Sequence, residues 1–493
     1  MLAMAVRNTK KLVRRYVASD KIRLGRYFTG ADTAATMAAS LCIPEKETVR
    51  VLDPGAGTGI LSAAIIEEIC QAGGVFRIEL TAYENDPRFL PMLRDNLERI
   101  RKKCRHDYGV RLAADVREAD FFTVGRGTEE PAAEGEESYD LILAAPPTGR
   151  PAPGSLAEET MNRLCPRGTD VSFIFAECAA ALLAPGGQMS VRLPASFANG
   201  AHAAPVRRRL FGFAPLIFLS LAADADGKMK KDLFCSVRRG ELPEEVEVRA
   251  IRGNRIEDLP PIPYHVAVYS EECKVLLPKK LSDLRLIRAM QALPCRFSDF
   301  GLVVRNGLTI ETRYPECLRS SRVDGAIPLL HPAGLRGAEV LFPAPGREKP
   351  YIVPRIPSLA QPNRTMLLVK RVPVRSDGRR LVVGVYYSGQ LPHDRQISTA
   401  NKFLCIEAES GEMDAAFATG LAAVLSSSYY ERYCALTDTI RRVNVSSLQL
   451  LPLPDRKTLA SIGQRLLVAR NLSLRVLDTV AGVFLAPFLG AEK

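Results

Sequence analysis

A glycine-rich turn that follows a short apolar run predicts a site for a nucleotide cofactor. Asp53 and Pro54 end the run, and Gly55, Gly57 and Gly59 follow them. Because glycine has no Cβ and tolerates positive φ, the backbone of this turn can pass close beneath a ligand. The spacing G-x-G-x-G differs from the G-x-G-x-x-G of dinucleotide sites, and an acidic residue before the turn would repel a pyrophosphate. Both features favour S-adenosylmethionine, whose sulfonium and ammonium groups are cationic, over NAD.

Two later segments add residues to this predicted cofactor site. Glu84 ends the next apolar run, where a carboxylate can accept hydrogen bonds from both hydroxyls of a ribose, and Asn85 follows it. Asp120 closes a third segment and is placed to accept a hydrogen bond from an adenine amino group. Phe121, beside it, can stack on the ring of the cofactor.

Positioning these residues requires alternating strands and helices, and the sequence from Val49 to Arg239 shows that alternation. Short β-branched or aromatic runs alternate with helix-like runs, which is the pattern of a doubly wound α/β sheet. We expect strands near residues 49–52, 79–84, 110–112, 139–144, 188–193, 215–221 and 232–238. We expect helices near residues 59–72, 87–104, 170–184 and 203–211. The last two strands have no helix between them, so they predict a hairpin at the edge of the sheet.

The length of the chain predicts two domains. Its 493 residues, 47% of them hydrophobic and 25% charged, exceed what one hydrophobic core usually organises. A change of composition after residue 250, with the proline-rich segment 259–263 as a stiff linker, divides residues 1–250 from residues 251–493. The second half mixes strands and loops without a clear period and ends in a helical tail over 456–484. We expect the polar segment 126–138 to be a mobile surface loop.

Composition narrows the choice of partners and compartment. The 67 Lys and Arg residues exceed the 55 Asp and Glu residues, and the net charge of +12 suits a polyanion such as nucleic acid. The 11 cysteines contain no CxxC pair, which favours reduced thiols in a cytoplasm and argues against zinc. The most apolar stretch, 210–223, is too short to cross a membrane, and the basic N-terminal segment lacks the apolar core of a signal peptide. We therefore expect neither a membrane span nor an export signal.

These motifs, in this order, resemble those of the gamma-class DNA adenine-N6 methyltransferases of type II restriction-modification systems, in the branch of the BsuBI and PstI modification enzymes. The family's G-x-Y-F-T-P segment wraps the methionine end of the cofactor, and residues 25–29 are similar to it, which implies cofactor contacts for Tyr27, Phe28 and Thr29. Residues 193–200 are similar to the family's P-R-S-F-x-x-G segment, which implies that Phe197 packs on the extruded base. The resemblance implies a Rossmann-like, seven-stranded methyltransferase domain followed by a mixed α+β target-recognition domain.

The catalytic motif of that family is changed in this chain. The fourth expected strand ends in Ala145, Pro146, Pro147 and Thr148, where the family has Asn or Asp, two prolines and an aromatic residue. In the family, the Asn side chain and the carbonyl of the first proline accept from the adenine amino group, while the aromatic ring stacks on the flipped base. Ala145 offers no side-chain acceptor and Thr148 no ring, which predicts reduced or lost turnover. Three explanations stay open: an engineered inactive variant, a natural pseudoenzyme, or an active site that recruits its second acceptor elsewhere.

The resemblance also implies the partners. They are double-stranded DNA and a paired restriction endonuclease in a bacterial cytoplasm, with no metal, because the sulfonium is already an activated leaving group. Arg207, Arg208 and Arg209 begin a helix-like run from which three guanidinium groups could grip phosphates, and Lys370 and Arg371 lie in a segment similar to the family's target-recognition region. A rival function is a DNA-binding protein that keeps the cofactor pocket but has lost turnover. A third is the methylation of RNA or of a small molecule.

Overall fold

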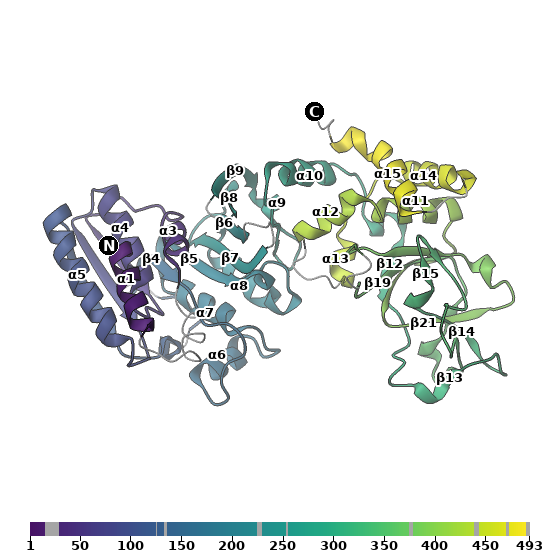
Figure 1. Ribbon diagram of the computed structural model, residues 1–493, viewed down its shortest axis with the longest axis horizontal. Coiled ribbons are helices and arrows are strands. Elements are labelled where there is room, and N and C mark those ends of the chain that lie inside the picture. Colours follow the sequence, from purple (N-terminus) through teal and green to yellow (C-terminus); the bar gives the residue numbers. More distant parts are fainter. Residues whose placement is uncertain are drawn as a thin grey trace. The chain divides into compact units, whose positions relative to one another are not determined.

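The chain forms two compact units, Met1–Lys280 and Leu281–Lys493, shown in purple to teal and in green to yellow in Figure 1. The computed structural model describes residues 1–14, 29–124, 126–132, 136–223, 229–252, 255–373, 378–437, 443–469 and 473–489. The first unit continues past residue 250, where we expected a boundary, because the next segment extends the same sheet.

A mixed sheet of nine strands forms the centre of the first unit. Its strands are β1 (Thr48–Asp53), β2 (Arg77–Tyr83), β3 (Arg111–Arg117), β4 (Tyr139–Ala144), β5 (Leu183–Pro194), β6 (Leu216–Ala223), β7 (Met229–Arg238), β8 (Glu245–Arg252) and β9 (Arg255–Pro263). They lie in the order β3-β2-β1-β4-β5-β7-β6-β8-β9. The first five strands run parallel, and β7 lies antiparallel between β5 and β6. The carboxyl ends of β1, β2, β3, β4 and β5 therefore meet at one edge, where ligands bind in sheets of this kind.

The sheet has two strands more than the seven that we expected. β8 pairs in parallel with β6, and β9 pairs antiparallel with β8. The interpretation of residues 259–263 as a linker is therefore wrong, since they belong to β9. Proline lacks an N–H donor, but β9 is the edge strand and needs no partner on its outer side.

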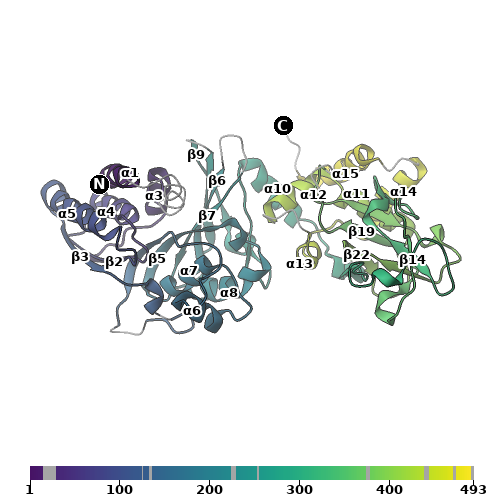
Figure 2. The same cartoon turned by 60° about the horizontal axis from the view of Figure 1, so that its bottom comes forward.

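Helices cover both faces of this sheet, as the turned view in Figure 2 shows. One face carries α1 (Leu2–Val13), α3 (Ala31–Ala38), α4 (Ile60–Ala72) and α5 (Leu90–Tyr108). The other face carries α6 (Leu156–Leu164), α7 (Val171–Ala180) and α8 (Ala204–Phe213). The unit ends with α9 (Tyr264–Ala267) and the short strands β10 (Val268–Tyr269) and β11 (Lys274–Val275). Helices α4, α5, α7 and α8 stand where the sequence predicted helices.

Only parts of segment 126–138 pack on the first unit: Glu129, Glu130, Glu136 and Glu137 are exposed, as expected for a surface loop, and residues 133–135 lie outside the described residues. Thr128 and Ala132 are buried, and the Ala132 N–H donates to the carbonyl of Ala181 at 2.9 Å. A Cβ on Gly127 would lie 2.9 Å from a methyl carbon of Leu164. The small residues within this polar segment thus allow it to approach α6 and α7.

The second unit combines two small sheets with six helices among its described residues. One sheet has the order β12-β22-β19-β20-β16-β15 and the other β13-β17-β14-β21-β18. The strands are β12 (Leu302–Asn306), β13 (Leu318–Arg319), β14 (Ile327–Leu330), β15 (Leu335–Arg336), β16 (Glu339–Val340), β17 (Tyr351–Ile352), β18 (Gln361–Pro362), β19 (Met366–Lys370), β20 (Val383–Tyr386), β21 (Gln396–Thr399) and β22 (Phe403–Ala408). The helices are α10 (Leu281–Gln291), α11 (Ala415–Leu425), α12 (Ser428–Thr437), α13 (Val445–Gln449), α14 (Arg456–Ala469) and α15 (Leu474–Leu489). The last two stand where we expected a helical tail.

Helices α11 and α14 cross with their backbones in contact. A Cβ on Gly420 would lie 1.8 Å from the carbonyl oxygen of Leu459, and one on Gly463 would lie 1.7 Å from that of Ala416. No side chain fits at such distances, so the crossing requires glycine on both helices.

Replacing Gly463 with alanine is therefore expected to lower the free energy of unfolding by about 3 kcal/mol or more, because overpacking forces the backbones apart. Gly482→Ala on α15 is the matched control, since its Cβ would lie at an ordinary 3.7 Å from Tyr429. We expect the control to stabilise the chain by up to about 1 kcal/mol through helix propensity. Urea denaturation followed by circular dichroism measures the free energy of unfolding of both variants. Equal denaturation midpoints for the two variants would contradict the close backbone contact of α11 with α14.

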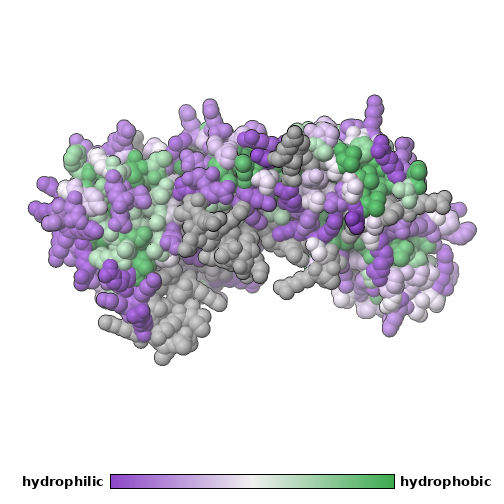
Figure 3. Space-filling view, turned by 45° about the horizontal axis from the view of Figure 1, so that its top comes forward, coloured by the Kyte–Doolittle hydropathy of each residue, from purple (hydrophilic) through white to green (hydrophobic). Residues whose placement is uncertain are grey.

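On the face drawn in Figure 3, the described residues form no continuous apolar band. Hydrophilic residues cover most of that face, and hydrophobic residues form separate patches. Of the helices that the structure describes, none is long and apolar enough to span a membrane.

Candidate functional site

The glycine turn after β1 forms a tight loop that leads into α4. The Ala56 N–H donates to the Tyr83 carbonyl at 2.8 Å, and the Gly59 N–H donates to the Ala56 carbonyl at 2.7 Å. Gly57 and Gly59 have φ angles of 56° and 84°, which residues with a Cβ rarely adopt. Gly55 is exposed, so the backbone itself forms the surface at this point.

Asp53 lies buried beneath this loop, with an exposed fraction of 1%. Its Oδ2 accepts hydrogen bonds from the Ser62 N–H at 3.1 Å and from the Ser62 hydroxyl at 2.6 Å. Among the described residues, none donates a well-formed hydrogen bond to Oδ1. Burial raises the pKa of Asp53 to about 6, although the Ser62 donors and the Gly55 amide oppose the rise. The site thus holds a buried acidic oxygen without a well-formed hydrogen-bond donor among the described residues.

Acidic residues from β2 and β3 surround the same loop. Glu84 is 9% exposed, and its Oε2 accepts from the Gly57 N–H at 2.7 Å. Burial also raises the pKa of Glu84. Asn85 donates from Nδ2 to Oδ2 of Asp120 at 3.4 Å, which links the ends of the two strands. The structure therefore brings together the acidic residues that the sequence assigned to the cofactor site.

Phe121 is buried, with its ring packed between two other rings. Its centroid lies 5.3 Å from that of Tyr83 and 4.8 Å from that of Phe175. The expected stacking of Phe121 on a cofactor ring requires one of these neighbours to move. Thr29 is buried as well, whereas Tyr27 and Phe28 lie outside the described residues.

Helix α7 separates the glycine turn from a second aromatic cluster. Asp170 caps this helix, because its Oδ1 accepts from the Ser172 N–H at 3.0 Å. Phe175 faces the cofactor side, where a Cβ on Gly55 would lie 3.7 Å from its Cζ. Phe173 precedes Phe175 by two residues, so it projects about 200° away around the helix. On that other side its ring centroid lies 5.1 Å from that of Phe197. One helix therefore supplies an aromatic wall to each region.

Helix α1 supports the glycine loop, a role that the sequence did not reveal. The hydroxyls of Thr9 and Thr58 lie 2.7 Å apart, and the Asn96 amide donates to the Thr58 carbonyl at 2.8 Å. Asn8 donates in turn to the Asn96 side chain at 2.7 Å. These contacts join residues far apart in sequence, so no local pattern could have shown them.

The loop that holds the altered motif follows β4, which pairs in parallel with β1. Ala145 is half-buried and Pro146 buried, whereas Pro147 and Thr148 are exposed. The Gly149 N–H donates to Oδ2 of Asp170 at 2.9 Å, and the Gly149 carbonyl accepts from the Val171 N–H at 2.9 Å. The loop is thus fixed to the first turn of α7, at the same sheet edge as the glycine turn.

Phe197 lies in the core, in contrast to the role that we expected for it. Its exposed fraction is 0%, and its ring contacts Phe173 edge to face and Phe211 at 6.0 Å. It sits in the turn after β5, where the ring points into the layer of α7 and α8. In this structure Phe197 therefore offers no face to an extruded base.

The arginine triplet faces three different surroundings. Arg207 is 0% exposed and donates to the carbonyls of Phe197, Gly200 and Glu272 at 2.6, 3.0 and 3.0 Å. Burial lowers the pKa of Arg207 to about 10. Arg209 binds the buried Glu177 through two hydrogen bonds of 2.7 Å. The expectation that all three guanidinium groups grip phosphates is therefore wrong for Arg207, which is buried. Arg209 is engaged by Glu177, so Arg208 is the exposed member of the triplet that could reach a phosphate.

Replacing Arg207 with alanine is expected to lower the free energy of unfolding by about 3 kcal/mol or more, because three buried carbonyls lose their donor. Arg208→Ala, next to it on the same helix, is expected to change that energy by less than about 0.5 kcal/mol. Urea denaturation compares the two variants. Similar destabilisation by both would contradict the structural role of Arg207.

The basic pair of the second unit lies at the end of β19. The Lys370 N–H donates to the Val382 carbonyl at 2.9 Å, and the Arg371 N–H donates to the Lys402 carbonyl at 2.8 Å. Both residues are partly exposed. Their backbones thus join neighbouring segments of the sheet, and their contact with DNA stays a prediction.

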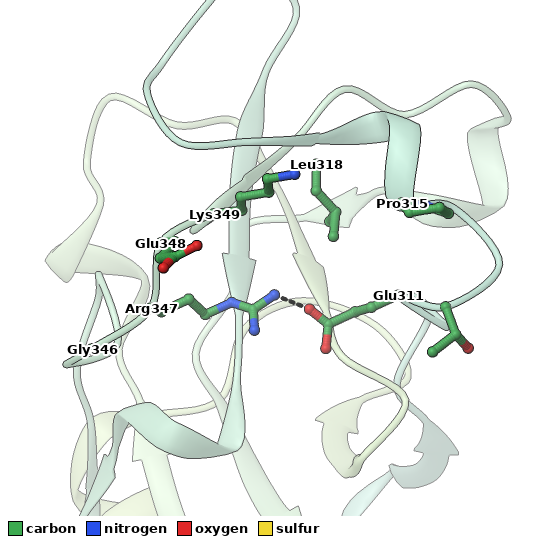
Figure 4. Close-up of a pocket in the computed structure, with 8 residues that line it drawn as sticks. Glu311, Pro315, Leu318, Gly346, Arg347, Glu348 and Lys349 are labelled. Atoms are coloured by element: carbon green, nitrogen blue, oxygen red, sulfur yellow. Dashed lines mark hydrogen bonds and ion pairs between the residues drawn. The ribbon is translucent and has the colours of Figure 1, made fainter.

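A cavity of about 460 Å³ opens elsewhere in the second unit, away from the predicted site residues. Two acidic and two basic residues are among those that line it, and Figure 4 shows the Arg347 guanidinium directed at the Glu311 carboxylate. His331 approaches the same carboxylate at 3.4 Å. Because these charges offset one another, the cavity presents no net charge to a phosphate. Among the described residues, no three His, Cys, Asp or Glu side chains are grouped as metal ligands would be.

Comparisons with known proteins give relatives along almost the whole chain. The chain is 23% identical over 462 residues to the type II methyltransferase M.PstI of Providencia stuartii, covering 90% of this chain and 89% of the relative. It is 20% identical to the type II methyltransferase M.BsuBI of Bacillus subtilis, covering 90% of each. Among solved structures, the type IIG restriction endonuclease BpuSI is similar with a TM-score of 0.42 and 13% identity, covering 92% of this chain and 64% of that chain. No protein-family model matches the sequence.

Proposed function

We propose that this chain, which is similar to type II methyltransferases over 90% of its length, transfers methyl groups from S-adenosylmethionine to N6 of adenine in duplex DNA. The observation that carries the proposal is that the acidic residues Asp53 and Glu84 and the loop of Pro146 follow neighbouring parallel strands at the same edge of the sheet. We infer that the protein protects bacterial DNA in the cytoplasm from a paired restriction endonuclease.

The two buried acidic residues fit a cationic cofactor. The buried Oδ1 of Asp53 lacks a well-formed donor among the described residues, and burial disfavours the ionised forms of both Asp53 and Glu84. A positive charge nearby compensates that cost. S-adenosylmethionine, when bound, supplies a methyl group already activated on a sulfonium. Asp53, Glu84 and Asp120 would hold it beside the exposed backbone of the glycine turn, and Phe121 would join them once Tyr83 or Phe175 moves.

The β4 loop supplies what remains of the catalytic motif. The lone pair of adenine N6 is delocalised into the ring, so the site must draw the amino group toward tetrahedral geometry with hydrogen-bond acceptors. The carbonyl of Pro146 is one such acceptor. The side chain of Ala145 offers none, and the loss of one transition-state hydrogen bond typically costs about a hundredfold to a thousandfold in rate. We therefore expect slow turnover.

The same observation favours a second candidate function. A chain with Ala145 and Thr148 in these positions could bind S-adenosylmethionine and DNA without turnover. Such a protein would recognise a DNA sequence, and its affinity for DNA would change when the cofactor binds. It would leave the adenine unmodified.

Methylation mapping of DNA from cells that express the chain tests both candidates. N6-methyladenine at one recurrent sequence supports the enzyme. Unmodified DNA together with calorimetric binding of S-adenosylmethionine supports the binding protein. Methyl label on RNA or on a metabolite, but never on DNA, contradicts both, and so does a failure to bind the cofactor.

A further inference from the structure

The proposed function leaves one requirement of the site without a residue. A base that is turned out of a duplex is usually held by stacking on an aromatic ring. Thr148 has no ring, and the ring of Phe197 is 0% exposed. A surface for the base must therefore come from another part of the same edge.

His202 lies at that edge. It belongs to a single turn of 3-10 helix, Ala201–Ala203, that follows β5 and the Phe197 turn. Its ring stacks on that of Phe173, with centroids 5.7 Å apart and planes inclined by 20°. Phe173 is buried and covers one face of the imidazole, and His202 as a residue is exposed, so part of the imidazole surface is accessible.

The structure fixes this ring beside the altered motif. Gly149 is bound to Asp170 and Val171, and Phe173 belongs to the same turn of α7, since its N–H donates to the Asp170 carbonyl at 3.0 Å. The buried Arg207 holds the other side of the loop by donating to the Gly200 carbonyl at 3.0 Å. A Cβ on Gly200 would lie 2.8 Å from Cε1 of His202, so glycine leaves room for the ring beside this turn.

We propose that His202, supported from below by Phe173, is the stacking surface for the base that the enzyme turns out of duplex DNA. This proposal rests on the proposed function. Burial keeps the pKa of His202 below its usual value, so the imidazole is neutral near pH 7 and behaves as a flat aromatic surface rather than as a cation. Stacking of this kind typically contributes about tenfold to a hundredfold in affinity for each base.

The test compares duplexes that differ only at the target base. The recognition duplex is first selected from a random pool by binding to the full chain, which requires no turnover. Each adenine of the selected site is then replaced in turn by an abasic nucleotide. We expect His202→Ala to bind the intact duplex about tenfold or more weakly than the unchanged protein, and to bind one of the abasic duplexes equally well. His202→Phe should restore binding to the intact duplex.

A matched control separates stacking from a folding defect. His106, whose side chain is 88% exposed on α5, is replaced by alanine and should bind every duplex as the unchanged protein does. If His202→Ala binds the intact duplex and all the abasic duplexes more weakly by the same factor, the proposal is overturned, because this result indicates a damaged loop. Unchanged binding overturns it too. If no sequence is selected from the pool, the proposed function itself fails, which is a different result from a failure of His202 alone.

Discussion

Replacing Ala145 with asparagine is expected to raise the rate of methyl transfer to adenine by about a hundredfold to a thousandfold, because the new side-chain oxygen supplies the missing acceptor. Ala145 is half-buried directly after β4 and packs against the core of the first unit. Asparagine is chosen because its carboxamide carries the acceptor oxygen of the motif that this segment resembles. Transfer of a tritiated methyl group to the selected duplex measures the rate under single-turnover conditions.

A second substitution in the same loop extends this test. Thr148 is exposed, so Thr148→Tyr adds a ring without disturbing the core, and stacking adds about 1 to 3 kcal/mol. Together with Ala145→Asn, the gain should reach about three to four decades of rate if the two effects are additive. Ala152→Asn, at an exposed position of the same loop, is the control and should leave the rate unchanged. An unchanged rate for Ala145→Asn, in a protein that still binds the cofactor, would show that Ala145 does not face the reacting amino group.

Replacing Asp53 with asparagine is expected to weaken the binding of S-adenosylmethionine by about tenfold to a hundredfold, because a buried charged acceptor is lost. Burial raises the pKa of Asp53 to about 6 in the free protein. A cationic cofactor favours the ionised carboxylate, so we expect the affinity to increase as the pH rises through about 6, with release of a proton. Calorimetry in buffers of different ionisation enthalpy measures both effects, and an affinity that does not change between pH 5 and pH 7 would contradict them.

Whereas a rise in pH is expected to strengthen cofactor binding through Asp53, the same rise is expected to lower the stability of the free protein. Its pKa is about 6 in the folded chain and 3.8 as the ordinary value, so the folded state binds the proton more tightly. The contribution of protonated Asp53 to the free energy of unfolding is about 3 kcal/mol. It is fully present below about pH 4 and is lost as the pH rises through about 6. Asp53→Asn should therefore gain about that much stability relative to the unchanged protein between pH 4 and pH 7. Glu118→Gln, at an exposed carboxylate, is the control.

The first half of the sheet could be predicted because its signals are local. The helices after β1 and β2 and the pairing of β6 with β7 follow from runs of apolar residues separated by turns, but the expected place of that hairpin at the sheet edge is wrong, because β8 and β9 lie beyond it. The glycine turn needs positive φ at Gly57 and Gly59, which the residue types alone indicate. Parallel strands also bring their carboxyl ends to one edge, so the meeting of Asp53, Glu84 and Asp120 there followed from the order of the motifs.

The predictions for the first unit were wrong where they depended on the direction of a side chain or on the position of a strand in the sheet. Three consecutive residues on a helix point about 100° apart, so Arg207, Arg208 and Arg209 could not all face one phosphate backbone. The period of the helix could have shown this. The burial of Phe197 depends on the packing of α7 and α8, which no local pattern encodes. The proline-rich segment 259–263 gave the signal of a linker, since only its place at the sheet edge permits a strand.

The second unit could not be derived because its strands are short and its pairings distant. Several strands contain two residues, and β12 pairs with β22 across about a hundred residues, as Val304 pairs with Ile406. Alternation cannot be recognised over so few positions. The backbone contact of α11 with α14 depends on two glycines, Gly420 and Gly463, that are ordinary by residue type alone.

Helix α7 has a consequence for how such a protein can change over evolution. Phe173 and Phe175 project from opposite sides of one rigid rod, so in the site that we propose a mutation that shifts the rod to admit a different nucleobase also displaces Phe175 beside the glycine turn. Divergence of target chemistry is therefore constrained by retention of the methyl donor. Paralogues with a new base preference should carry compensating changes at both aromatic positions rather than at one.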